Sequence, residues 1–100
     1  MRWSLLLGLL ACTRVPAVAP ERLAAMRQVN DEDAVRACTL LGRFLGSSTQ
    51  AGEKGLEQAR AEARAKCAAT GATDFYYDNQ SVTPDVITVA AKAYDCGAVR

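Results

Sequence analysis

The sequence predicts a small α+β domain in which a mainly antiparallel sheet of three to four strands packs against one amphipathic helix. Two segments carry most of this prediction. Residues 53–70 contain no Pro and many alanines at helical spacing, whereas residues 86–94 alternate between two faces with the period of a strand. The length of 100 residues fits one domain, and the hydrophobic fraction of 50% indicates a globular chain.

The predicted helix has one apolar stripe and two charged faces. Glu62 and Lys66 have the i,i+4 spacing that supports an exposed helical surface, and Gly71 follows where a glycine commonly ends a helix. Cys67 lies in the apolar stripe and is therefore expected to be a small buried residue. The whole stripe comprises Leu56, Ala59, Ala63, Cys67 and Thr70.

Four segments have the composition of strands. They are the short residues 26–30, the apolar residues 35–45, the aromatic residues 73–77 and the alternating residues 86–94. The apolar segment predicts a central strand, with a bulge at Gly42.

Polar clusters between these segments predict turns. Residues 78–81, with Asp, Asn, Gln and Ser, have turn composition, and Pro84 precedes the last strand. Residues 31–33 are all acidic but lack the ligand spacing of a calcium loop, so we expect a solvated turn there.

The amino terminus has the pattern of a bacterial lipoprotein signal. Arg2 gives a positive start, residues 3–10 form a short apolar run, and residues 9–12, Leu-Leu-Ala-Cys, match a lipobox. In such signals the peptide is removed just before the cysteine, whose thiol carries the lipid. The pattern predicts lipidation at Cys12.

This pattern divides the chain into a signal peptide at residues 1–11, the lipidated terminus with a short tether at residues 12–25, and the α+β domain at residues 26–100. A multiply acylated cysteine gives durable attachment, because a single myristoyl chain holds only marginally. Thr13 stands where an Asp would retain such lipoproteins in the inner membrane. We therefore expect the outer membrane, with the domain facing the periplasm.

Three other interpretations of the terminus compete. A membrane-spanning helix needs roughly 20 apolar residues, about twice the length of this run. An ordinary secretory signal cut after Ala19 would place Pro20 behind the cut, a poor position for that peptidase. The third alternative is a buried helix over residues 1–11 with Cys12 as a core thiol.

Three further cysteines remain for the domain, and the periplasm permits disulfides. With Cys67 assigned to the helix stripe, Cys38 and Cys96 are the favoured pair. Three reduced thiols, or Cys67 paired with one of the others, are the alternatives. Strand alternation puts Cys96 on the Tyr94 face but Cys38 on the Phe44 face, so the favoured pair requires a bulge or a bend.

The order of these pieces resembles a family of small bacterial lipoproteins of unknown function, over roughly residues 26–96. The resemblance rests on residues 38–44 (CTLLGRF), the Gly-Ser stretch at 46–48, the end of the helix at 66–73 (KCAATGAT) and residues 93–96 (AYDC). The chain is similar, more distantly, to the outer-membrane lipoprotein that reports envelope stress to the Rcs phosphorelay. That sensor has two disulfides from four domain cysteines, whereas this domain has three cysteines.

Composition and motifs exclude several functions. A net charge of +1 without a basic tract is too small for a nucleic-acid binder. The absence of His removes Ser-His and Cys-His nucleophile pairs and the usual catalytic zinc sites. No Gly-Lys-Ser or Gly-Lys-Thr follows the glycines at residues 46–55, so a phosphate loop is absent too. We expect no catalysis, no cofactor, no metal and no small-molecule substrate.

The sequence therefore predicts a lipid-anchored, periplasm-facing envelope protein with a binding, structural or stress-monitoring role. Its expected partners are the membrane, through lipid on Cys12, and an envelope protein. The second hypothesis is a thiol-redox protein that uses Cys67 with Cys38 or Cys96. Such a protein needs an exposed thiol in an electropositive environment, so the surroundings of Cys67 distinguish the two.

Overall fold

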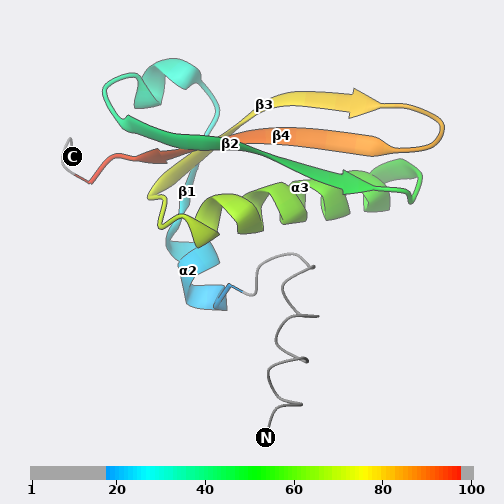
Figure 1. Ribbon diagram of the computed structural model, residues 1–100, viewed down its shortest axis with the longest axis horizontal. Helices are drawn as coiled ribbons and strands as arrows, with labels where there is room; N and C mark the ends of the chain where they lie inside the picture. The colour runs from blue at the N-terminus through cyan, green and yellow to red at the C-terminus, as the bar shows by residue number, and fades with distance from the viewer. Residues whose placement is uncertain (1–17, 98–100) are drawn as a thin grey trace, which may run out of the picture.

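The computed structural model of the protein describes residues 18–97, and the predicted signal peptide, Cys12 and residues 98–100 lie outside them. The described chain forms a four-stranded sheet in the order β1-β3-β4-β2, with the long helix α3 across one face (Figure 1). β4 pairs antiparallel with β2 and β3, whereas β1 pairs parallel with β3. The predicted α+β class, with a mainly antiparallel sheet and one main helix, is confirmed.

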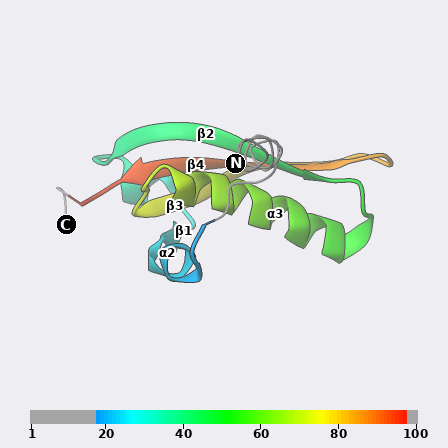
Figure 2. The ribbon, with the colours of Figure 1, turned by 60° about the horizontal axis from the view of Figure 1, so that its bottom comes forward.

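In chain order the elements are α2 at Pro20–Ala25, β1 at Arg27–Val29, the 3₁₀ helix η1 at Glu32–Val35, β2 at Thr39–Ser48, α3 at Gly52–Ala69, β3 at Asp74–Val82 and β4 at Ile87–Asp95. α2 and α3 lie on the same side of the sheet (Figure 2). Within residues 18–97, no helix combines the length and the apolar character that crossing a membrane requires.

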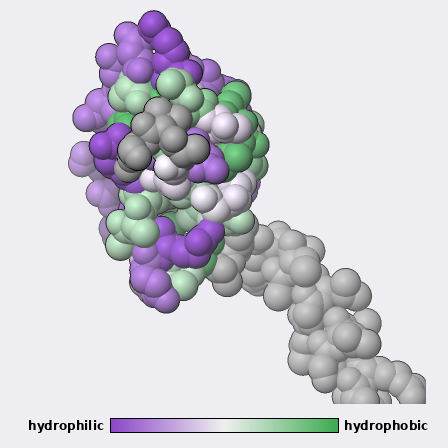
Figure 3. All heavy atoms as spheres, turned by 90° about the vertical axis from the view of Figure 1, so that its left-hand side faces the viewer, coloured by the Kyte–Doolittle hydropathy of each residue, from purple (hydrophilic) through white to green (hydrophobic). Residues whose placement is uncertain are grey.

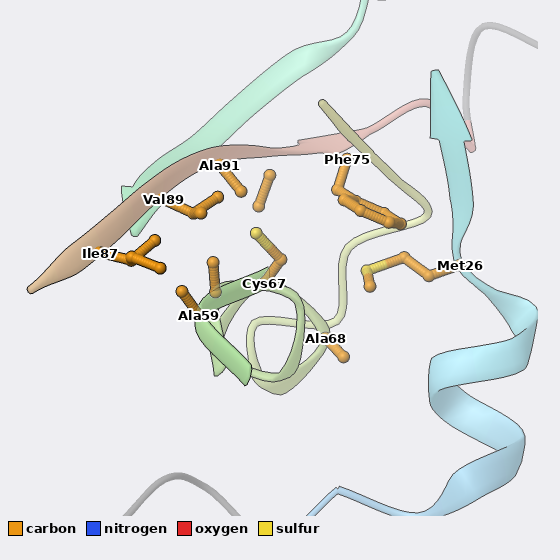
Figure 4. Close-up of a cluster of buried hydrophobic side chains, with 10 residues drawn as sticks. Met26, Ala59, Cys67, Ala68, Phe75, Ile87, Val89 and Ala91 are labelled. Atoms are coloured by element: carbon orange, nitrogen blue, oxygen red, sulfur yellow. The ribbon is translucent and has the colours of Figure 1, made fainter. Parts of the chain in front are cut away.

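The main core lies between α3 and the sheet and is built largely from small side chains. Ala59, Ala63 and Cys67 of the helix are fully buried against Phe75 and Val89 of the sheet (Figure 4). The predicted helix stripe therefore packs against the face of β4 that carries Val89. The remaining buried members of this core are Met26, Ala68, Ile87, Ala91 and Ala93.

Small side chains let α3 approach β2 closely. At Gly46, an added Cβ atom would lie 2.0 Å from the carbonyl oxygen of Ala59 and 2.6 Å from the backbone nitrogen of Ala63. Only glycine fits this contact without a shift of strand or helix. At its other end the helix stops as predicted, since Gly71 has a φ of 83°. Thr70, predicted in the buried stripe, is instead exposed and donates its hydroxyl to the carbonyl of Cys67.

A second, smaller core lies on the opposite face of the sheet, beneath η1. Val29, Val35, Tyr94 and Cys96 are buried there, and Cys38 and Tyr76 pack against them. Because η1 covers only one end, the rest of this face is open.

β2 lies at the edge of the sheet, so the predicted central strand over residues 35–45 is wrong in its position and its start. A continuous apolar run is typical of a strand buried on both faces. Here Leu40, Leu41 and Leu45 are 54%, 39% and 49% exposed, so this edge strand is not buried on both faces.

Side chains of α3 cover part of this edge. Lys66 Nζ donates to the carbonyl oxygen of Leu45 over 2.7 Å, and the Ser47 backbone N–H donates to Glu62 Oε1 over 2.6 Å. The predicted Glu62–Lys66 ion pair is present, at 3.9 Å. These two residues thus satisfy backbone groups that an unpaired edge strand would offer to another chain.

The register between β2 and β4 shifts between Leu40 and Gly42, which confirms the predicted bulge. Before the shift, Leu40 faces the side of the sheet away from α3, whereas Phe44 after it packs toward α3. The extra residue thereby puts Cys38 and Cys96 on the same side, which strict alternation would not have done.

Residues 78–81, predicted to form a turn, belong to β3. Asn79, Gln80 and Ser81 pair with β4 after a bulge at Asp78, and these cross-strand contacts override the turn preference of the residue types. The connection to β4 lies further on, where the Thr83 backbone N–H donates to the Val86 carbonyl over 3.0 Å.

Helix α2 lies inside the segment predicted to be a tether, so ordered structure begins before residue 26. Pro20 occupies the start of the helix, where its missing N–H costs no hydrogen bond. Leu23 packs against the main core, and Arg64 Nη2 donates to its carbonyl oxygen over 3.1 Å. These contacts fix a short helix that has no buried residue of its own.

Candidate functional site

The structure joins Cys38 and Cys96 in a disulfide, with the sulfurs 2.10 Å and the Cα atoms 4.7 Å apart. This is the pair that the sequence favoured. Cys38 lies just before β2 and Cys96 just after β4, so the bond closes one end of the β2–β4 pair. Cys96 is 2% exposed, whereas Cys38 is only partly buried.

A hollow of about 410 Å³, open to solvent, lies beside this bond between η1 and the start of β2. Its apolar wall consists of Val35, Cys38, Leu40 and Tyr94, and its charged rim consists of Glu32, Asp33 and Arg36. Figure 3 views the end of the molecule that carries the last described residues, where apolar and polar side chains are interspersed. The lining of the hollow itself is mixed, with both apolar and charged residues.

Polar contacts fasten η1 to the sheet. Lys92 Nζ lies 2.7 Å from Glu32 Oε2, and the Tyr94 hydroxyl donates to the same oxygen over 3.3 Å. The hydrogen bond from Lys92 lowers the pKa of the Glu32 carboxyl and raises the pKa of Lys92 itself. Burial raises the pKa of Tyr94. At pH 7 Glu32 and Lys92 thus form a charged pair, and the Tyr94 phenol is neutral.

The predicted acidic turn at residues 31–33 is the start of η1. Asp31 accepts a hydrogen bond from the Asp33 backbone N–H over 3.0 Å and so caps this short helix, while Asp33 pairs with Arg36. All three acidic side chains are exposed, as expected for a solvated segment. Residues 18–97 contain no group of three or more Cys, Asp or Glu side chains placed to hold a metal ion.

A buried polar network that the sequence did not reveal lies next to Cys96. Asp74 is 0% exposed and lies 3.0 Å from Arg27 Nε. Thr73 donates its hydroxyl to Asp74 Oδ1 over 2.8 Å and accepts from the Cys96 backbone N–H over 2.8 Å. The network ties β1, β3 and the end of β4 together. In the sequence, the only indication of this network is an acidic residue, Asp74, at the first position of β3.

The two tyrosines of β3 take different positions. Tyr77 packs toward α3, where its hydroxyl donates to the Arg60 carbonyl over 3.2 Å and its ring meets Phe75 edge-on at 5.2 Å. Burial raises the pKa of Tyr77. Tyr76 packs on the other face, against the second core. Both rings thus contribute to packing, on opposite faces of the sheet.

Cys67 lies in the main core, on the opposite side of the sheet from the disulfide. It is fully buried, and this burial raises the pKa of its thiol from 9.0 to about 11. The neighbouring Arg64 and Lys66 donate to backbone carbonyls of Leu23 and Leu45. Cys67 is therefore a structural thiol without the exposed thiolate that redox chemistry needs.

We expect Cys67 to resist maleimide in the folded protein at pH 7 and to react within minutes once urea unfolds the chain, which mass spectrometry measures.

The raised pKa of Cys67 also predicts that stability depends on pH in the alkaline range. As pH rises above 9, the thiol ionises in the unfolded chain but stays protonated in the folded chain until about pH 11, so the free energy of unfolding falls. The Cys67→Ala variant should lose this part of the alkaline dependence; an identical pH profile would contradict the burial.

The sequence matches no protein-family model and no curated protein sequence. The resemblance to a lipoprotein family therefore stays a prediction.

Proposed function

We propose that this protein is a lipid-anchored envelope protein that faces the periplasm and acts by binding or structural interaction rather than by catalysis. The observation that supports this best is the Cys38–Cys96 disulfide, which closes the sheet next to a solvent-exposed hollow. Structural disulfides persist in oxidising compartments such as the periplasm and are rare in the cytosol. The lipobox ending at Cys12 supplies the anchor in the same proposal.

The anchor would hold the domain close to the membrane. Only five residues lie between Cys12 and Val18, the first described residue, and this stretch reaches at most about 20 Å when fully extended. A tether of this length cannot carry the domain across the periplasm. Any partner must therefore come to the membrane surface, which favours a neighbouring envelope protein.

The hollow suits binding better than turnover. Its carboxylates are paired, Glu32 with Lys92 and Asp33 with Arg36, and they lie on the rim rather than deep in a water-excluding cleft. General acid–base catalysis needs a group whose pKa is tuned toward the working pH. The hydrogen bond from Lys92 shifts the pKa of Glu32 downward, away from that range. The burial of Cys67 likewise favours the binding role over the thiol-redox alternative.

The test is palmitate labelling in cells that carry the full chain. We expect label on the wild-type protein and recovery in the membrane fraction, with label lost in Cys12→Ala because no other cysteine can take its place. The matched control is Cys67→Ala, which should remain labelled. Label that persists in Cys12→Ala, or an unlabelled wild-type chain in the soluble cytoplasmic fraction, would refute the anchor.

A further inference from the structure

The two cysteines of the disulfide differ in their surroundings. Cys38 borders the hollow of about 410 Å³ together with Leu40 and Tyr94, whereas Cys96 is 2% exposed and does not line it. In thiol–disulfide exchange a thiolate attacks one of the two sulfurs, and access is one of the factors that decide which. We infer that Cys38 is an exchange site at which a low-molecular-mass thiol enters through the hollow and bonds to this sulfur.

The step balances as a simple exchange. The incoming thiolate bonds to Cys38 Sγ, the bond between the two cysteines breaks, and its electron pair leaves on Cys96 Sγ, which takes a proton from water. The product carries a mixed disulfide at Cys38 and a free thiol at Cys96. The external thiol supplies the reducing equivalent, and a second molecule of it can release Cys38.

The surroundings allow this step without rearrangement of the main core. The hollow is open, and its volume is ample for a thiol of a few heavy atoms. The bond lies on the face of the sheet away from α3, so Cys67 cannot compete as the attacking group. Glu32 remains held by Lys92 and Tyr94, which keeps η1 on the sheet while the junction at Cys38 opens.

The chain offers a matched pair of variants for the role of the hollow. Leu40 and Leu45 lie in the same strand, have similar exposed fractions of 54% and 49%, and face the open side of the sheet. Only Leu40 lines the hollow. Leu40→Trp should shield Cys38, whereas Leu45→Trp adds the same bulk outside the hollow.

The experiment exposes the full oxidised chain briefly to cysteamine, traps free thiols with N-ethylmaleimide and maps both groups by peptide mass spectrometry. We expect cysteamine on Cys38 with maleimide on Cys96 to exceed the reverse product by roughly tenfold. Leu40→Trp should slow the exchange roughly fivefold, and Leu45→Trp should leave its rate unchanged. Circular dichroism verifies that both variants fold.

An adduct mainly on Cys96, or equal amounts on the two cysteines, would overturn the inference, and the wild-type map alone decides this. Equal slowing by both tryptophan variants would overturn the role of the hollow. These outcomes do not depend on lipid at Cys12, so failure of the anchor and failure of the exchange site are distinguishable.

Discussion

Replacing Cys96 with Ser is expected to lower the free energy of unfolding by about 4 kcal/mol. The disulfide joins positions 58 residues apart, so its loss frees a long loop in the unfolded chain. A domain this small has a limited core, and a link of this size is a large fraction of its net stability. Urea denaturation followed by circular dichroism measures the change.

The control for this prediction is the Cys38→Ser, Cys96→Ser double variant. Both variants lack the same bond, so the double variant should lose little more stability than Cys96→Ser alone. An unchanged denaturation midpoint in the single variant would show that the bond contributes nothing in solution. A doubled loss would show that the two side chains act separately.

Gly46→Ala is expected to destabilise the fold by about 3 kcal/mol. The new methyl group would meet the backbone of α3, 2.0 Å from the Ala59 oxygen and 2.6 Å from the Ala63 nitrogen. Backbone atoms cannot rotate aside as a side chain can, so the helix must move away from β2. The same urea titration measures this loss.

Gly42→Ala provides the matched control in the same strand. The added Cβ there would lie 3.0 Å from Phe44 Cζ, the far end of a side chain that can turn. We expect a loss below about 1 kcal/mol. An equal loss in the free energy of unfolding for both substitutions would contradict the role of the close contact between β2 and α3 at Gly46.

Hydrophobic periodicity correctly predicted α3 and β4, the two elements that bury one apolar face in the main core. The spacing of Ala59, Ala63 and Cys67 and the alternation around Val89 were sufficient, because one face of each element is buried in the main core. The bulge at Gly42 followed from its local composition. The bulge also places Cys38 and Cys96 on the same face of the sheet. Predicting this would have required the register between β2 and β4, which is set by contacts between residues far apart in the chain.

The position of β2 and the extent of β3 depend on which strands are neighbours in the sheet. The residue types of a segment alone do not determine this. The segment predicted as a central strand over residues 35–45 contributes to an edge strand at Thr39–Ser48, and the polar residues 78–81 continue a strand. Of the site, the sequence indicated the cysteine pair and the solvated acidic segment. It did not indicate the hollow or the pairing of Glu32 with Lys92, because these residues are 60 positions apart and meet only when η1 folds over β4.

The contacts of Glu62 and Lys66 with β2 have a consequence for how copies of the chain tolerate crowding. At high local concentration, an unpaired edge strand can pair with the same strand of a second copy and begin a fibre. Glu62 and Lys66 keep the Leu45 carbonyl and the Ser47 backbone N–H occupied. These two side chains would thus protect the chain from edge-to-edge association at high local density.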